Sequence, residues 1–231
     1  NRTVDLVRSR GAKVIAIVNR RNSDLCDKSD GVLYTSDGRD VEMSVASTKA
    51  FYAQIAAGLV LATAIADIVP GAVHSSSPRQ QELLAALREL PAKMAETLAR
   101  RDVIAAAAHQ FGPPRRYWAI VGNGPNAIAA RELRIKLSEL CYKSIACDAT
   151  EDKKHIDLSA EPMILVCAAG LIGSTAADVG KEVAIYRAHK AAPIVTDYRK
   201  VMDVVKAEVK VVPALAKVAK GDGMFAALYV H

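Results

Sequence analysis

The stretch YWAIVGNGPNAIAARELRIKLSELC, residues 117–141, decides the fold class of this chain. It begins with an apolar run at 117–121, passes through a glycine-containing loop at 122–125, and then reads as a helix. An apolar strand, a short loop and a helix in this order are typical of the βαβ units that build a parallel sheet covered by helices. The sequence therefore predicts an α/β fold.

The same alternation of strand and helix extends in both directions from this stretch. Further strands are predicted at 13–18, 31–35, 143–147, 162–167 and 193–196, and further helices at 3–10, 23–27, 45–69, 81–109 and 174–189. Continuous apolar runs such as 13–18 are typical of parallel strands buried on both faces.

Proline, glycine and serine at 70–80 interrupt the pattern, and Pro91 marks a local boundary in the helical stretch that follows. We predict a partial first domain at 1–75, a helical connection at 76–115 and a second domain at 116–231. A strand–loop–helix unit is expected before Asn1, because the chain begins with what reads as the end of a helix.

Composition and charge exclude several classes of protein. Of the 231 residues, 51% are hydrophobic and 24% are charged, which suits a globular core and excludes disordered and fibrous chains. The net charge of +6 is spread along the chain instead of forming a basic face. We therefore predict no nucleic-acid partner, with room for an anionic substrate. The polar first residues do not resemble a signal peptide, which favours a cytoplasmic protein.

The cysteines indicate neither a disulfide framework nor a zinc site. Cys26, Cys141, Cys147 and Cys167 are scattered, without the paired spacing of metal ligands. We expect reduced, mostly buried thiols, as in cytoplasmic proteins, and no metal.

Residues 50–66 carry no charge and are nearly long enough to span a bilayer. The stretch is rich in alanine, includes Gln54 and Gly58, and is bounded by Lys49 and Asp67. These features favour a helix buried in a core or an interface over a membrane span. We predict no membrane insertion, and we predict a homodimer because this uncharged surface exceeds what one face of a small domain needs to bury.

The loop after the strand at 117–121 matches the G-x-G-x-x-A pattern of dinucleotide-binding proteins through Gly122, Gly124 and Ala127. Asp148, at the end of the next strand, would then bind the ribose of a dinucleotide in an oxidoreductase. The alternative is a tight strand-to-helix turn that binds no ligand.

Two further groups of polar residues are candidates for binding or chemistry. Ser47, Thr48 and Lys49 open the long helix, where hydroxyls and free N–H groups suit an anion or sugar hydroxyls, or where a serine simply caps the helix. Glu132, Lys136 and Glu139 share one helix face at spacings of four and seven residues, as either a surface ion-pair ladder or a base beside a cation.

His155 follows in a polar segment, where it is either solvated or able to transfer a proton near neutral pH.

At VASTKAF, residues 45–51, the sequence resembles the sugar isomerase (SIS) domains of the glutamine–fructose-6-phosphate aminotransferase family. Residues 11–19, 29–35 and 38–42 are also similar to that family. A second match places Glu132, the run KLSE at 136–139 and Tyr142 on the family's E-G-A-L-K-L-K-E-I-S-Y helix, and His155 after a lysine on its K-H pair. Together these matches cover about residues 1–200.

The resemblance implies two flavodoxin-like SIS subdomains, with parallel sheets flanked by helices, that interconvert fructose 6-phosphate and glucosamine 6-phosphate skeletons. Glu139 would move the proton between C1 and C2, Lys136 would lie beside it, and His155 would assist ring opening from a neighbouring subunit. The backbone of Val45 and the hydroxyls of Ser47 and Thr48 would contact the sugar. An enediol route needs only a positioned carboxylate, so no metal or other cofactor is expected.

The sequence also departs from the family pattern. The serine-rich phosphate loop is expected before Asn1, the glutaminase domain is absent, and Ser138 replaces a lysine. The family's Gly-Pro after the histidine is Ile-Asp at 156–157, and residues 215–218 are only faintly similar to its C-terminal L-A-K-S-V. The alternative reading is therefore a non-catalytic SIS module that binds sugar phosphates or mediates dimerisation.

Overall fold

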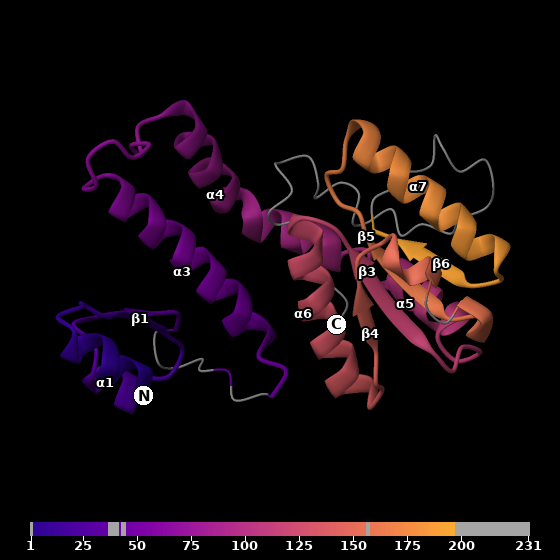
Figure 1. Ribbon diagram of the computed structural model, residues 1–231, viewed down its shortest axis with the longest axis horizontal. Helices are drawn as coiled ribbons and strands as arrows, with labels where there is room; N and C mark the ends of the chain where they lie inside the picture. The colour runs from indigo at the N-terminus through magenta and orange to yellow at the C-terminus, as the bar shows by residue number, and fades with distance from the viewer. Residues whose placement is uncertain (1, 37–41, 43–44, 156–157, 197–231) are drawn as a thin grey trace. The chain divides into compact units, whose positions relative to one another are not determined.

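The computed structural model describes residues 2–36, 42, 45–155 and 158–196 (Figure 1). The chain divides into two compact units, residues 1–88 and residues 89–231. Most of the family match at 38–42, the Ile-Asp pair at 156–157 and the predictions beyond residue 196 lie outside the described residues.

The first unit is built around a pair of short parallel strands. Its elements are α1 (Arg2–Ser9), β1 (Ile15–Val18), α2 (Asp24–Asp27), β2 (Gly31–Tyr34), α3 (Thr48–Ala66) and the first half of α4 (Pro78–Leu98). Strand β1 pairs with β2 in parallel, with Ile15 opposite Gly31 and Val18 opposite Tyr34. The predicted strand–helix–strand order is confirmed here.

Local sequence explains where the first helices begin and end. After α1 the amide of Gly11 donates to Arg8 O at 2.9 Å and that of Ala12 to Val7 O at 3.1 Å, which is the Schellman arrangement. Gly11 takes a φ of 81°, a conformation that glycine adopts without steric cost. The side chain of Ser23 accepts a hydrogen bond from the amide of Cys26 and caps α2, which forms within the predicted helix at 23–27.

Helix α3 is shorter and less buried than its sequence indicates. It runs from Thr48 to Ala66 instead of 45–69, and among its described residues Ala50 and Thr63 alone are buried. The expectation of a helix buried in a core is therefore not met within the first unit. By length and composition α3 could cross a membrane, but a single helix of this kind is weak evidence for a span.

Two helices form the predicted stretch 81–109, and their break does not fall at Pro91. Helix α4 continues through Pro91 to Leu98, and α5 (Arg101–Phe111) follows after residues 99 and 100. The φ that the proline ring fixes lies within the helical range, so Pro91 removes a hydrogen bond without ending the helix. Gly112 caps the end of α5.

The second unit contains a four-stranded parallel sheet with the order β4-β3-β5-β6. Its strands are β3 (Trp118–Gly122), β4 (Ala146–Asp148), β5 (Met163–Cys167) and β6 (Ala192–Val195), joined by α6 (Pro125–Cys141), the 3₁₀ turns η1 (Asp152–His155) and η2 (Leu158–Ala160), and α7 (Gly173–Ala188). The chain adds β4 on one side of β3 and then β5 on the other. This reversal is the flavodoxin-like pattern, and the predicted fold class is confirmed.

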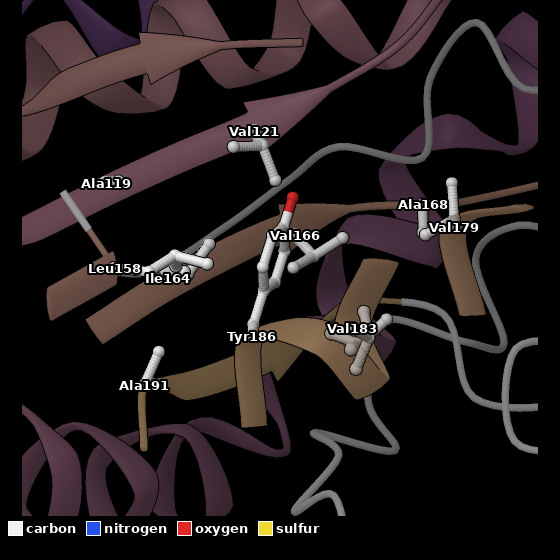
Figure 2. Close-up of a cluster of buried hydrophobic side chains, with 11 residues drawn as sticks. Ala119, Val121, Leu158, Ile164, Val166, Ala168, Val179, Val183, Tyr186 and Ala191 are labelled. Carbon is white, nitrogen blue, oxygen red and sulfur yellow. The ribbon is translucent and has the colours of Figure 1, made fainter. Parts of the chain in front are cut away.

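The core of the second unit lies on both faces of this sheet. On one face the fully buried ring of Tyr186 packs among Val121, Val166 and Val183 (Figure 2). On the other face Ile120 and Cys167 pack with Ala130 of α6. All four cysteines are free, but Cys167 alone is buried, so the prediction of mostly buried thiols is wrong.

Candidate functional site

The glycine loop after β3 is a close-packed turn. A side chain at Gly122 would place its Cβ 2.5 Å from the carbonyl oxygen of Asn126 and 3.2 Å from Cys167 Cβ, so glycine is needed for α6 to approach the sheet. Gly124 has φ 55° and ψ −131°, a backbone conformation that residues with a side chain rarely adopt.

The first amides of α6 are used within this turn. Pro125 carries no N–H, the amide of Asn126 donates to Asn123 O at 3.1 Å, and that of Ala127 donates to Gly124 O at 3.0 Å. A phosphate bound at a helix N-terminus needs such amides as donors. The geometry therefore favours the tight-turn alternative for the G-x-G-x-x-A pattern over a dinucleotide site.

Two asparagines connect the loops at the carboxyl edge of the sheet. The buried Asn126 side chain donates to Ala169 O at 3.0 Å and accepts from Ala169 N at 3.2 Å, which joins the start of α6 to the loop after β5. The Asn123 side chain accepts from Thr150 N at 2.9 Å and donates to Glu151 Oε2 at 2.8 Å. Sequence reasoning missed both roles, because the partners are 27–43 residues away and no spacing rule links them.

The end of β4 carries polar atoms without partners. Asp148 Oδ2, Thr150 Oγ1 and Glu182 Oε2 are buried and accept or donate no hydrogen bond. The hydroxyl of Tyr186 donates to Thr150 O, and burial followed by the charge of Glu182 raises the pKa of Tyr186. Because buried polar groups are costly when unpaired, this edge is suited to hold ordered water. The described residues contain no group of three His, Cys, Asp or Glu side chains placed to hold a metal ion.

Helix α6 presents the predicted carboxylate–lysine–carboxylate row. Lys136 forms an ion pair with Glu132, and the two side chains are 14% and 17% exposed. Glu139 lies one turn further along and is exposed to solvent. The structure thus places the lysine against the first carboxylate of the row and leaves the carboxylate of Glu139 accessible.

His155 ends the 3₁₀ turn η1 and is exposed. The preceding residue, Lys154, reaches Glu182 Oε1 of α7 at 2.6 Å and fixes the turn to that helix. The sequence predicts a polar loop at this position, whereas the structure has a 3₁₀ turn. The polar residues around His155 do not by themselves indicate such a turn.

The residues predicted to contact sugar lie at the start of α3 in the first unit. Val45 is 85% exposed, Ser47 takes the left-handed conformation with φ 47° at the N-cap position, and Thr48 is the first helical residue. The Glu42 carboxylate accepts a hydrogen bond from Ala50 N at 2.7 Å. A negative charge therefore already occupies this helix terminus, which favours a neutral ligand group such as a hydroxyl over a second anion.

Comparisons with known proteins agree with the residues quoted above. Residues 1–64 match the family model of the SIS domain. The chain is 34% identical over 141 residues to glutamine–fructose-6-phosphate aminotransferase [isomerizing] of Haemophilus influenzae, covering 61% of this chain and 22% of that protein. The enzyme of the same name from Leifsonia xyli is 34% identical over 152 residues, covering 66% and 24%. The chain thus spans less than a quarter of the length of these relatives.

Solved structures show the same fold. The C-terminal domain of glucosamine-fructose-6-phosphate aminotransferase from Francisella tularensis superposes with a TM-score of 0.74 at 18% identity, covering 97% of this chain and 66% of that chain. A protein assigned as a phosphosugar isomerase in Silicibacter pomeroyi gives a TM-score of 0.64 at 21% identity, with coverages of 97% and 64%. Residues 1–64 thus match a sugar isomerase (SIS) domain, and the chain shares the fold of these solved structures.

The chain is similar to glutamine–fructose-6-phosphate aminotransferases, and the resemblance drawn from its motifs is confirmed.

Proposed function

We propose that this chain is a sugar-phosphate isomerase module, the portion of an aminosugar-forming enzyme that acts between fructose 6-phosphate and glucosamine 6-phosphate. The observation that carries the proposal is the presence of both family motifs in one chain, one at the start of α3 and one along α6. The chain is also similar to enzymes named glutamine–fructose-6-phosphate aminotransferase. Neither motif alone is as specific as the two in the family's order.

The proposed chemistry follows from the exposed carboxylate on α6. Moving a proton between C1 and C2 of a sugar requires a base that reaches both carbons, and a carboxylate can do so through an enediol. Glu139 is assigned this role because its carboxylate is accessible while that of Glu132 is engaged with Lys136.

The other site residues are assigned to ring opening and to substrate binding. His155 is exposed at the end of η1 and assists ring opening by transferring a proton. Val45 offers its backbone, and Ser47 and Thr48 offer hydroxyls, to the hydroxyl groups of the sugar. The proposal requires no metal or other cofactor. It places the protein in the cytoplasm as a homodimer, without a nucleic-acid partner or membrane insertion.

The alternative is a non-catalytic SIS module that binds sugar phosphates or mediates dimerisation. The apolar helix α3 favours it, since most of its described residues are not buried within the first unit and a second copy could cover them.

Calorimetric titration combined with an isomerisation assay separates these possibilities. The isomerase proposal expects binding of fructose 6-phosphate and glucosamine 6-phosphate, together with turnover. Binding without turnover would favour the alternative. Tight binding of NAD without any response to sugar phosphates would overturn both. Sedimentation that shows a monomer at micromolar concentration would contradict the homodimer.

A further inference from the structure

Helix α4 links the two units, and the boundary between them falls inside it. The first unit ends at Arg88 and the second begins at Glu89, while α4 runs without a break from Pro78 to Leu98. A helix that crosses a unit boundary either holds the two units at a fixed angle or bends to change that angle.

The backbone of α4 is weakest at this boundary. Pro91 has no N–H, so the carbonyl of Leu87 loses the hydrogen bond that residue i+4 normally donates, and the proline ring presses against that carbonyl. The missing bond would have joined Leu87 to Pro91 across the Arg88–Glu89 boundary. Sharp bends in helices occur most often at such prolines.

Both ends of α4 are fixed, each to its own unit. At the first end the amide of Ser75 donates to Asp67 Oδ1 at 2.6 Å, and Gln81 Nε2 donates to Ser75 O at 2.7 Å. At the second end Thr97 is buried, and α5 follows at once with Ile104 in the core of the second unit.

The middle of α4 lacks such support. Arg88, Glu89, Pro91 and Ala92 are exposed, and Thr97 is the one buried residue among the described residues of this helix. By comparison, α7 buries five residues along one face. Between Leu87 and Pro91 only the half-buried Leu87 and Leu90 add packing to the helical hydrogen bonds, at the place where one of those bonds is missing.

We propose that α4 is a hinge, and that the two units change their relative orientation by bending this helix at Leu87–Pro91. The proposal goes beyond isomerase activity and does not depend on it. The motion is placed in the helix and not in the loops at 67–77 and 99–100. Hydrogen bonds within the first unit hold the loop at 67–77, and the core of the second unit holds α5, which follows the loop at 99–100.

Spin-label distance measurements on the whole chain test the proposal. Exposed residues Arg10 and Lys181 are replaced by cysteine for labelling, one in each unit, after Cys26, Cys141 and Cys147 have been changed to serine. Cys167 can remain, because burial raises its pKa to about 12 and keeps the thiol protonated and unreactive.

The variant Pro91→Ala supplies the missing backbone N–H and introduces a residue with high helix propensity. We therefore expect a stiffer helix and a narrower distribution of distances between the two labels. Pro91→Gly is the matched control, because it restores the N–H but leaves the backbone pliable, and its distribution should stay broad. Equal widths in the parent protein and in Pro91→Ala would overturn the hinge.

Amide exchange of the unlabelled parent gives a second, independent test. We expect the amides of residues 88–90 and 92 to exchange at least about tenfold faster than those in the middle of α7, since local opening follows weak hydrogen bonding. Protection equal to that of α7 would also overturn the proposal, whatever the variants do.

Discussion

The parallel strands of the two units have similar sequences but differ in how deeply their side chains are buried. Both units contain short runs of Val, Ile, Leu and Ala, yet Ile15 and Tyr34 at the ends of the first pair are 51% and 39% exposed, while Ile120 and Ile164 in the second sheet are fully buried. The second sheet has four strands and a buried cluster on each face, and the first has two strands. Burial thus depends on how many elements surround a strand as much as on its own hydrophobicity.

The helices repeat this contrast between the units. Helix α3 is the more apolar in composition and buries two of its described residues, whereas α7 carries several charges and buries five. A row of small and branched residues at Ala176, Val179, Gly180 and Val183 fits α7 closely against its sheet. The second unit therefore buries more of its helix α7 than the first unit buries of α3.

The largest expected effect is a loss of isomerisation rate when the catalytic group proposed in the second unit is changed. A change to a binding group proposed in the first unit should instead weaken substrate binding. Glu139→Gln keeps the shape of the side chain but cannot accept a proton, so the isomerisation rate should fall by about 10²–10⁴-fold with little change in substrate affinity. Ser47→Gly removes a hydroxyl at a left-handed position that glycine tolerates, and should mainly weaken binding, by about 1 kcal/mol.

Steady-state kinetics and calorimetry on these variants decide the outcome. Glu96→Gln is the matched control, since it neutralises another exposed helical carboxylate of the second unit that has no proposed role. Near-normal turnover of Glu139→Gln would remove the catalytic assignment.

Truncating one isoleucine in each sheet sharpens the comparison of burial. Ile164→Ala removes a fully buried side chain from β5 and should lower the free energy of unfolding of the second unit by about 2–5 kcal/mol. Ile15→Ala acts on a half-exposed side chain of β1 and should cost less than about 1 kcal/mol. Urea unfolding followed by the fluorescence of Trp118, the single tryptophan, reports on the second unit, and amide exchange at β1 reports on the first. Similar losses in both variants would contradict the contrast between the sheets.

A pair of glycine substitutions should move stability in opposite directions. Gly122→Ala places a methyl group against the backbone of Asn126 and should destabilise the second unit by about 1–3 kcal/mol. Gly58→Ala lies inside α3 with no atom within 4 Å of the added carbon, and should stabilise the first unit by about 0.5–1 kcal/mol. Thermal unfolding of the two variants measures both shifts, and a stabilising Gly122→Ala would show that α6 can move away from the sheet.

The smallest expected effect is a loss of stability at acid pH that is confined to the first unit. The amide of Val14, which donates to Asp30 Oδ2 at 2.9 Å, lowers the pKa of Asp30, and Lys13 and Arg8 lower it further. Because the folded chain binds this proton less readily than the unfolded chain, the stabilisation is present above the ordinary carboxyl pKa of 3.8 and is lost as the pH falls below it.

Asp30→Asn should abolish this acid dependence. NMR signals of β1 followed from pH 6 to acid, in the parent and in the variant, provide the measurement. The same pH dependence in both proteins would assign it to another carboxylate.

The elements predicted from sequence were those with strong local patterns. The strands with continuous apolar runs and the short helix predicted at 23–27 follow from residues adjacent in the chain. The strand expected at 143–147 begins later, at Ala146, because the amide of Lys143 donates to Ser138 O and completes the end of α6. Such a competition between a helix end and a strand start cannot be seen in the apolar pattern alone.

The candidate site was predictable to a lesser degree. The spacing of four residues predicted the pair Glu132–Lys136, and the structure confirms that pair. The carboxylate of Glu42 at the start of α3 was missed, because its partner amide is that of Ala50 and nothing in the spacing marks it. The roles of Glu139, His155 and Val45 stay predictions, since they depend on the family resemblance and on a bound sugar.

The two hydrogen bonds of the Asn123 side chain also determine what deamidation of this residue would do to the protein during storage. Asn123 is followed by Gly124, which has no side chain to hinder attack of its backbone nitrogen on the asparagine amide. Loss of that amide would replace the donor that faces Glu151 Oε2 at 2.8 Å with a carboxylate oxygen, and two like charges would then meet at the end of β4. Deamidation at this one position, which mass spectrometry of stored protein can detect, should therefore loosen the turn at Thr150 before other parts of the second unit change.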